Sequence, residues 1–305
     1  MTEVPNVAII ILNWNNLADT LACLRSVAAL DYPAERLQII VVDNGSTDDS
    51  VARIRAAYPD VTLIETGANL GYAGGNNVGI RHALARGAEY IWLLNDDIIV
   101  APDSLFRLVE VARQIPDAAF LGPKVYIKND PGRIFSVGGP FIDGWQPIHL
   151  GLGEMDSGQY ENVLDVDYLS GCALFANAKA INAIGLLDED FFAYHEDTEW
   201  CFRAKRTGWR VISVPSARVW HPDTRRRDET SSLVTYYTTR NHLLFLQKHH
   251  LGWQPVLKSL ARYLVWIANW SLNPKWKHFK GKRNALCWAL LDFARGNTGR
   301  IERQL

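Results

Sequence analysis

Two short apolar runs decide the fold: VAIIIL at Val7–Leu12 and LQIIVV at Leu37–Val42. Each run is too short for a helix and nearly free of polar residues, which is typical of a parallel strand buried on both faces. Between them, apolar side chains recur at helical spacing, at Leu17, Leu21, Leu24, Val27 and Leu30. This order of strand, helix and strand predicts a parallel α/β sheet.

The same alternation continues along the chain. Further strands are predicted at 61–65, 90–94 and 118–121, with helices near 50–57, 76–85 and 103–114. After Pro123 the glycine-punctuated stretch 134–153 predicts a hairpin or long loop. Beyond it we expect strands at 166–175 and 210–214, helices at 178–184 and 196–207, and a mostly helical region from Leu233 onward. The predicted class is α/β, a Rossmann-like mixed sheet followed by a helical extension.

Charge divides the chain into two parts. Residues 233–305 hold twelve Lys or Arg and two acids, a net +10, so the remainder carries −11 of the total of −1. We therefore predict a first domain at 1–232, with halves at 1–123 and 124–232, and a basic extension at 233–305. The extension also holds five of the eleven tryptophans.

Basic side chains interleaved with indole rings suit an anionic, partly apolar surface such as lipid headgroups. The stretch 251–270 is interrupted by Lys258 and Arg262, which disfavours spanning a membrane. Read as a helix, this stretch places on one side Leu257, Leu260, Ala261, Leu264 and Ile267. The basic cluster that follows, around Trp276, comprises Lys275, Lys277, Lys280, Lys282 and Arg283. A solvated basic face, a helical cap or an interface between two copies of the chain would use the same residues, and residues 1–232 offer nothing that supports nucleic-acid binding.

The N-terminus has no basic segment followed by an apolar one, so we expect a cytosolic protein, with peripheral contact to the inner face of the cell membrane through the extension. Four cysteines lack the spacing of a zinc ribbon or a disulfide framework, and we expect buried, inert thiols.

Polar residues follow four consecutive predicted strands. They are Asn13 and Asn15, then Asp43 and Asn44, then the segment 69–77, and finally Asn95, Asp96 and Asp97. Ligands of doubly wound sheets bind beyond the carboxyl ends of the strands, so four such ends together predict a binding site.

Adjacent carboxylates, as in Asn95-Asp96-Asp97, repel unless a positive charge compensates, and a divalent cation with oxygen ligands is one such charge. An acidic helix cap before Pro102 is the alternative. The segment NLGYAGGNN at 69–77 leads into a helix, where glycines permit close approach of a ligand and N-terminal amides favour a diphosphate. A glycine-rich turn capped by asparagine is equally open, whereas the spacing does not fit a dinucleotide site.

Taken in order, VAIIILNWNN, VVDNGSTDDS, NLGYAGGNNVGI and YIWLLNDDI resemble the nucleotide-sugar half of family 2 glycosyltransferases. LSGCALF, GLLDEDFFAYHEDTEWCFRAKRTG and VWHP extend the resemblance over about three quarters of the chain. It implies a GT-A fold and a metal, Mg²⁺ or Mn²⁺. It also implies inverting transfer of a sugar from a nucleoside diphosphate to a hydroxyl.

The resemblance also implies roles for individual residues. Asp43 would contact the base or ribose, and Asn13, Asn15, Asn69, Gly74, Asn76, Asn95 and Asp96 would complete the nucleotide-sugar site. Asn95 replaces the first Asp of the DXD pattern, so metal binding would fall on Asp97, with His221 as a second ligand. Asp197 would be the general base, and Glu196 the alternative, with Glu196 and Glu199 otherwise holding the acceptor or capping the helix.

Similarity to bacterial rhamnosyltransferases favours dTDP-rhamnose as donor and a polysaccharide or lipid-linked glycan as acceptor. A UDP-hexose or UDP-galactofuranose is the alternative donor. Two other classes remain: a nucleotide-sugar-binding protein without activity, and a nucleotidyltransferase. The latter should carry Arg or Lys after its first strand, where this chain has Asn13–Asn16.

Overall fold

The structure is a computed structural model that describes residues 4–222 and 231–304, apart from the side chains of Pro274 and Lys277. The chain divides into two compact units. The first comprises Met1–Leu187 and Asp197–Asp223, and the second Asp188–Glu196 and Thr224–Leu305. Residues 223–230, next to the domain boundary expected at 232/233, lie outside the described residues, so that boundary stays a prediction.

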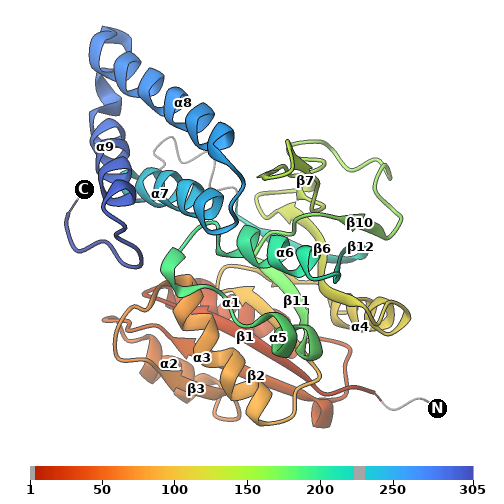
Figure 1. Ribbon diagram of the computed structural model, residues 1–305. Helices are drawn as coiled ribbons and strands as arrows, with labels where there is room; N and C mark the ends of the chain where they lie inside the picture. Colours follow the sequence, from red (N-terminus) through yellow and green to blue (C-terminus); the bar gives the residue numbers. More distant parts are fainter. Residues whose placement is uncertain (1–3, 223–230, 305) are drawn as a thin grey trace. The chain divides into compact units, whose positions relative to one another are not determined.

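The first unit is a mixed β-sheet with helices on both faces, which confirms the predicted α/β class with a Rossmann-like mixed sheet (Figure 1). The strand order is β10-β12-β6-β11-β4-β1-β2-β3, with β5 beside β12 and β7 beside β6. The main strands are β1 Val7–Asn13, β2 Leu37–Asp43, β3 Thr62–Glu65, β4 Tyr90–Asn95, β6 Ala118–Ile127, β10 Leu164–Val166, β11 Ala173–Asn177 and β12 Arg210–His221. The shorter or peripheral strands are β5 Ile99–Val100, β7 Asp130–Ser136, and the hairpin β8 Phe141–Ile142 with β9 Gln146–Pro147. The helices are α1 Leu17–Ala28, α2 Ser50–Ala57, α3 Gly71–Ala85, α4 Ser104–Gln114, α5 Ala178–Ile184 and α6 Glu196–Arg206, with the 3-10 turn η1 Ala34–Arg36.

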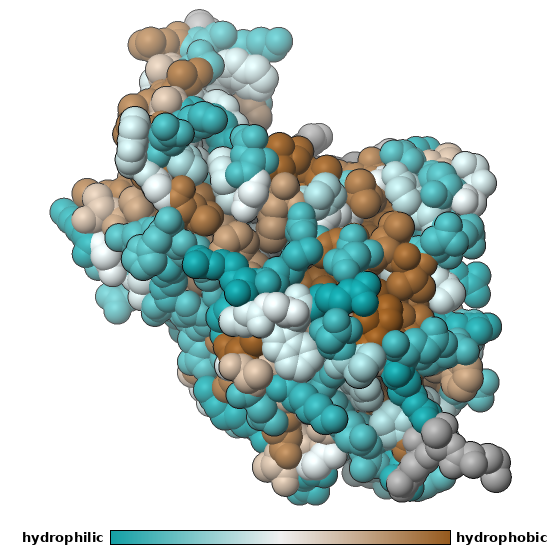
Figure 2. Space-filling view, turned by 45° about the vertical axis from the view of Figure 1, so that its right-hand side comes forward, coloured by the Kyte–Doolittle hydropathy of each residue, from teal (hydrophilic) through white to brown (hydrophobic). Residues whose placement is uncertain are grey.

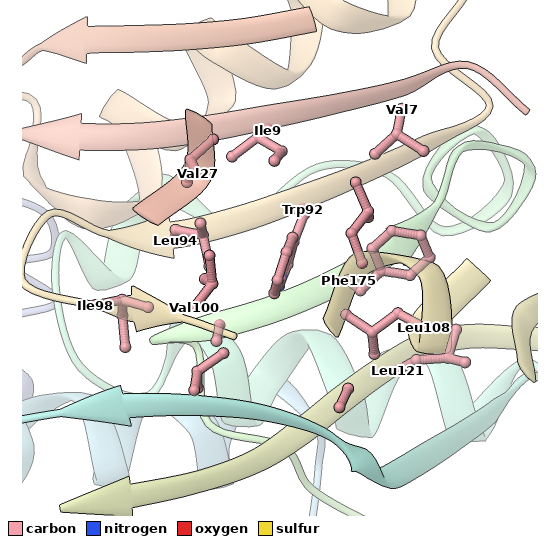
Figure 3. Close-up of a cluster of buried hydrophobic side chains, with 14 of the residues drawn as sticks. Val7, Ile9, Val27, Trp92, Leu94, Ile98, Val100, Leu108, Leu121 and Phe175 are labelled. Atoms are coloured by element: carbon pink, nitrogen blue, oxygen red, sulfur yellow. The ribbon is translucent and has the colours of Figure 1, made fainter. Parts of the chain in front are cut away.

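The core follows the two-residue period of β1. Its residues Val7, Ile9 and Ile11 face one cluster together with α1 and α4, whereas Ala8 and Ile10 face a second cluster with α3, α5 and α6. Figure 3 shows the first cluster, where Trp92 of β4 lies between β1 and the helix α4. Because both faces are covered, each large apolar side chain here contributes roughly 1.5–3 kcal/mol by leaving water.

One strand prediction is wrong. The stretch 166–175 is not a single strand but two, β10 and β11, which flank a loop at 167–172. β10 pairs with β12, whereas β11 pairs with β4 and β6, so the chain must turn between them. Apolar residues within the loop imitate a buried strand.

Two other boundaries differ from prediction. The helix expected at 76–85 begins at Gly71, so the glycine-rich segment lies within α3. A Cβ at Gly75 would lie 2.5 Å from Leu12 Cδ1, and one at Gly79 would lie 2.7 Å from Ile10 Cγ2. These two glycines allow α3 to lie close on β1. The strand expected at 210–214 extends as β12 to His221.

The second unit is helical, as predicted. It contains α7 Ser232–Lys248, α8 Trp253–Leu272, η4 Pro274–Phe279, α9 Lys280–Ala294 and the turn η2 Glu189–Phe191. Tyr236 and Tyr237 of α7 pack on Ala285 and Ala289 of α9. Among the described residues, no helix combines the length and apolar character needed to cross a membrane. Three cysteines are buried as expected, but Cys287 is exposed on α9.

Candidate active site

Strand register brings the predicted residues to one edge of the sheet. β1 lies between β2 and β4 and is parallel to both. Asn13 is opposite Asp43, and Leu12 is opposite Asn95. The polar residues that end these strands are therefore neighbours, as expected from the carboxyl ends of parallel strands.

Asn13 and Asp43 form a buried pair. Asn13 Nδ2 donates to Asp43 Oδ1 at 2.8 Å, while Asn13 Oδ1 accepts from the Thr20 hydroxyl at 2.8 Å. The second oxygen of Asp43 accepts from the Ser46 N–H at 3.1 Å. These bonds fix the direction of the Asp43 carboxylate and leave part of its capacity to accept hydrogen bonds.

Asn15 has a different position. Its backbone is left-handed, with φ of 52°, and its Oδ1 accepts from the Thr47 N–H at 2.7 Å. The side chain thus ties the loop after β1 to the loop after β2. Between Asn13 and Asn15, Trp14 is 51% exposed, and no motif in the sequence marked it as a site residue.

The start of α3 is held by asparagine side chains. Asn69 Oδ1 accepts from the Gly71 N–H at 2.8 Å, and Asn44 Oδ1 accepts from the Leu70 N–H at 3.0 Å. Asn69 therefore caps the turn. Gly74 is buried in the following turn. Asn76 donates to the Tyr72 carbonyl at 2.9 Å, but its Oδ1 is buried without a hydrogen-bond partner in the described part of the chain.

Asp97 and His221 meet beyond β4. His221 Nε2 lies 3.5 Å from Asp97 Oδ1, and the imidazole is 7% exposed. Neither Asp97 Oδ1 nor His221 Nδ1 has a hydrogen-bond partner among the residues described, and the same holds for Asn95 Oδ1. Buried polar atoms are normally bonded, so these three atoms, on residues at or just beyond the ends of β4 and β12, point to a ligand.

The neighbouring Asp96 lies in a different environment. Burial and, to a lesser extent, the charge of Asp97 raise its pKa, which lies at about 7 although hydrogen bonds from the Asn16 side chain and the Trp14 backbone lower it. Asp96 therefore points to the loop after β1 and Asp97 to β12.

Asp97 and His221 can contribute to a metal site, but they do not form one alone. Within residues 4–222 and 231–304, no three His, Cys, Asp or Glu side chains are grouped so as to hold an ion. A divalent ion of the Mg²⁺ type takes one or two protein ligands and completes its shell with substrate phosphates and water. A carboxylate oxygen and an imidazole nitrogen, both lacking donors or acceptors, fit that arrangement.

Asp197, in the first turn of α6, is fully hydrogen-bonded. Its Oδ1 accepts from the N–H (2.6 Å) and hydroxyl (3.2 Å) of Thr198. Its Oδ2 accepts from the Gly171 N–H at 2.8 Å and the Tyr168 hydroxyl at 3.1 Å. Burial raises the pKa of Tyr168 well above its usual value, with the Asp197 charge acting in the same direction, so this hydroxyl stays protonated and donates.

The loop at 167–172 joins this carboxylate to the rest of the site. The Asn95 N–H donates to the Cys172 carbonyl at 2.9 Å, and the Tyr72 hydroxyl of α3 donates to the Gly171 carbonyl at 2.6 Å. A Cβ at Gly171 would lie 3.1 Å from Asp197 Cβ. Tyr168 and Gly171 were missed because 166–175 was interpreted as a strand, although the glycine in LSGC was an available signal. Tyr72 was missed because its partner, the Gly171 carbonyl, is distant in sequence.

The other acids of α6 differ from Asp197. Glu196, its first residue, is 6% exposed. Glu199 is buried and forms a bidentate pair with Arg203, at 3.0 and 2.7 Å. Arg203 also donates to the carbonyl of Leu186. Glu199 therefore fastens α6 to the preceding loop.

Comparison with known proteins agrees with this geometry. The model of the family described as "Glycosyltransferase like family 2" matches residues 5–240. The chain belongs to this family. This glycosyltransferase is 30% identical over 256 residues to an N-acetylglucosaminyl-diphospho-decaprenol L-rhamnosyltransferase of Mycobacterium tuberculosis, covering 75% of the chain and 81% of that relative. It is 27% identical over 290 residues to the dTDP-rhamnosyl transferase RfbF of Shigella flexneri, covering 90% of the chain and 93% of RfbF.

Solved structures confirm the GT-A fold of this glycosyltransferase. The mannosyltransferase PcManGT from Pyrobaculum calidifontis, in complex with GDP-Man and Mn²⁺, aligns with a TM-score of 0.61 at 17% identity. The alignment covers 96% of this chain and 88% of that one. At this identity the likeness shows the fold alone.

Proposed function

We propose that this glycosyltransferase transfers rhamnose from dTDP-rhamnose, with inversion and with Mg²⁺ or Mn²⁺, to a hydroxyl of a polysaccharide or lipid-linked glycan. The observation that carries the proposal is the pair of half-buried Asp97, just after β4, and buried His221, at the end of β12, together with the Asn13–Asp43 pair and the hydrogen-bonded Asp197. The donor sugar follows the names of the two relatives.

The donor would lie along the strand ends. Asp43, oriented by Asn13, would accept hydrogen bonds from the nucleoside, and the exposed indole of Trp14 offers an aromatic face to the base. Asn76 and Asn95 each present a buried amide oxygen to donor hydroxyls. Asp97 and His221 would hold the metal, which neutralises charge on the departing diphosphate.

Asp197 would act on the acceptor. As the acceptor oxygen forms its bond to the anomeric carbon, the bond from that carbon to the diphosphate breaks and the leaving group takes the electron pair. The acceptor proton passes to a carboxylate oxygen of Asp197, which frees a lone pair by giving up one of its longer bonds, that from the Tyr168 hydroxyl at 3.1 Å or that from the Thr198 hydroxyl at 3.2 Å. Its two oxygens are held by Gly171, Tyr168 and Thr198, so the base is positioned before substrate binds.

The proposed acceptor is a lipid-linked glycan or a growing polysaccharide, because the mycobacterial relative is named for a decaprenol diphosphate substrate. Work on such an acceptor would take place beside a membrane, at its cytoplasmic face.

A donor panel tests the proposal. Titration calorimetry with dTDP-rhamnose, UDP-galactofuranose and UDP-glucose, each with Mn²⁺, Mg²⁺ or EDTA, should show tightest binding for dTDP-rhamnose with metal. The anomeric configuration of the product, measured by NMR, should be opposite to that of the donor. Tight binding without turnover on any acceptor would favour a nucleotide-sugar-binding protein, and metal-independent binding would remove the ion from the proposal.

A further inference from the structure

The side of α8 that faces away from its own unit is apolar. Its inner side packs Tyr263, Leu260 and Ile267 against Leu243 of α7 and Leu286 of α9. The outer side carries large exposed side chains, with exposed fractions of 69% for Trp253, 52% for Leu257, 60% for Leu264, 56% for Val265 and 82% for Leu272. Ala261 and Ala268 are exposed as well. Leu260 and Ile267, expected on the same side as Leu257, instead belong to the inner side.

These outer residues form one continuous stripe. At 100° per residue they fall within about a third of the helix circumference, so they form a face and are not scattered. We call the stripe of Trp253, Leu257, Ala261, Leu264, Val265, Ala268 and Leu272 the α8 outer face. Isolated exposed apolar residues are common, but a continuous face of this kind marks an interaction surface.

An apolar groove adjoins the outer face. It has a volume of about 520 Å³ and lies at the start of α8, where Trp253 and Leu257 line it together with Val256, Leu246 of α7 and Phe293 of α9. The outer face therefore continues into a hollow lined by hydrocarbon.

The charges around the outer face are of one sign. No acidic residue occurs between Glu229 and Asp292. Lys258 is exposed beside the face, and the Arg262 guanidinium lies 5.7 Å from the centroid of the Trp266 ring. Past the end of α8, Lys275 lies 5.4 Å from the Trp276 ring and Lys282 lies 4.5 Å from the Phe279 ring. The side chain of Lys277, part of this cluster in sequence, lies outside the described residues. Figure 2 shows apolar and hydrophilic side chains next to each other over the surface of these helices.

We propose that the α8 outer face binds an anionic lipid bilayer, with its apolar side chains in the acyl region and the flanking cations at the phosphates. The long stems of Lys258 and Arg262 reach from the margin of the helix to the headgroups. Indole rings favour this boundary, where one end of the ring is apolar and the other is wet. The basic cluster contributes an attraction that falls with salt, which a protein partner of neutral charge would not share.

Flotation with vesicles tests the outer face directly and needs no donor, metal or acceptor. The full chain should co-float with phosphatidylcholine vesicles that contain phosphatidylglycerol at low salt. The Leu257→Glu/Leu264→Glu double variant should co-float at least about tenfold less, because two carboxylates replace hydrocarbon that enters the membrane. Leu152→Glu, the same change at an exposed leucine of the first unit, is the matched control and should behave like wild type.

Two further measurements distinguish an anionic membrane from a second copy of the chain as the partner of the α8 outer face. Vesicles without phosphatidylglycerol, or high salt, should lower co-flotation of the wild type by about tenfold. Failure of the wild type to co-float at low salt overturns the proposal, as does equal flotation of the double variant. Sedimentation of the wild type and of the double variant tests for a second copy of the chain. If the wild type forms a dimer, the double variant does not, and neither binds vesicles, the face is an interface between two copies and the membrane proposal is overturned. Transfer to a soluble acceptor, unchanged in the double variant, keeps this result independent of the proposed activity.

Discussion

Asp97 and Asp197 are both half-buried carboxylates of the first unit, yet their surroundings differ. Asp97 Oδ1 has no hydrogen-bond donor in the described part of the chain, and the His221 imidazole is 3.5 Å away. Asp197 accepts four hydrogen bonds, two on each oxygen. A carboxylate has about four lone-pair positions, so Asp197 is saturated while Asp97 is not. The hydrogen bonds of Asp197 are complete within the protein, whereas Asp97 retains an oxygen that a ligand could bind.

These different surroundings predict different roles for Asp97 and Asp197. An unbonded buried oxygen costs free energy, and a protein keeps such an atom where something binds. A carboxylate held by several donors is fixed in direction, as a general base must be, and Asp197 can take a proton once one of its two hydroxyl donors moves away. Asp97 should therefore govern donor binding and Asp197 the chemical step.

The largest expected effect belongs to Asp197→Asn. The amide cannot take a proton, and its Nδ2 would face an N–H group of Gly171 or Thr198. We expect turnover to fall by about a hundredfold or more, as for other lost general bases, with donor affinity within about twofold of wild type. Steady-state kinetics and calorimetry measure the two quantities. Glu196→Gln is the paired variant: if it loses turnover while Asp197→Asn keeps it, the base is Glu196.

Asp97→Ala should affect binding. It removes the charged oxygen ligand, and Asn95 supplies only a neutral amide, so donor affinity in Mn²⁺ should fall at least about tenfold. The variant should bind donor equally with metal and with EDTA. Asp103→Ala removes an acid that pairs with Arg107, elsewhere in the same unit, and is the control. A metal response retained in Asp97→Ala would refute its assignment as a ligand.

The segment before Asp197 offers a sharper test. In the second unit, Asn241 Nδ2 donates to the carbonyls of Phe191, Ala193 and Tyr194 at 2.7–2.8 Å. Phe192, Tyr194 and His195 have left-handed backbones, with φ of 61°, 69° and 73°. Such conformations cost roughly 1–3 kcal/mol each and persist only where surrounding bonds impose them. Asn241 thus holds the backbone of residues 191–194, a segment of its own unit that precedes Asp197 in the sequence.

Asn241→Ala should lower kcat by about tenfold or more and leave donor affinity unchanged, because a small displacement of a catalytic group is costly. Asn284→Ala, an exposed asparagine of the same unit, is the matched control. A variant that melts earlier but has wild-type kcat well below its melting temperature would show that Asn241 only stabilises the fold.

Much of the fold was predictable because its signals are local. The runs at Val7–Leu12 and Leu37–Val42 are too short for buried helices and form strands β1 and β2. The helix predicted between them from its apolar spacing is α1. Asn13, Asp43 and Asn95 could be predicted to lie together because each ends a strand, and parallel strands share their carboxyl edge. The assignment of 188–196 to the second unit had no local signal, because it depends on which side chains bind that segment.

The loop at 167–172 was not predictable for the same reason. The apolar residues of this loop are compatible with a continuous strand over 166–175. Only the pairing of β10 with β12 and of β11 with β4 shows that the strand is interrupted. The roles of Tyr168 and Gly171 as donors to Asp197 arise from contacts across 26 or more positions of sequence. The glycines in 69–77 predicted either a ligand cradle or a glycine-rich turn. The structure adds a packing role for Gly75, and for Gly79 beyond that segment, because both lie against β1.

The smallest expected effect tests the saturation of Asp197 itself. Tyr168→Phe removes one of the four donors and keeps the ring, which packs edge-on against His149. We expect kcat to fall a few-fold, on the order of 1 kcal/mol in barrier, because three donors still hold the carboxylate. The pKa of Tyr168 lies well above its usual value, so its hydroxyl donates throughout the range of about pH 6 to 9, and the ratio of wild-type to variant kcat should be constant there.

Tyr126→Phe is the matched control for this change. The Tyr126 hydroxyl also donates to a carboxylate, that of Asp156, which Lys124 binds as well. Both variants lose a tyrosine–carboxylate bond, so both should lose stability by a similar amount, roughly 1.5–3 kcal/mol. Only Tyr168→Phe should lower kcat at matched stability. Equal kcat in the two variants would mean that the fourth donor adds nothing to the direction of Asp197, and the contrast with Asp97 would then rest on three bonds.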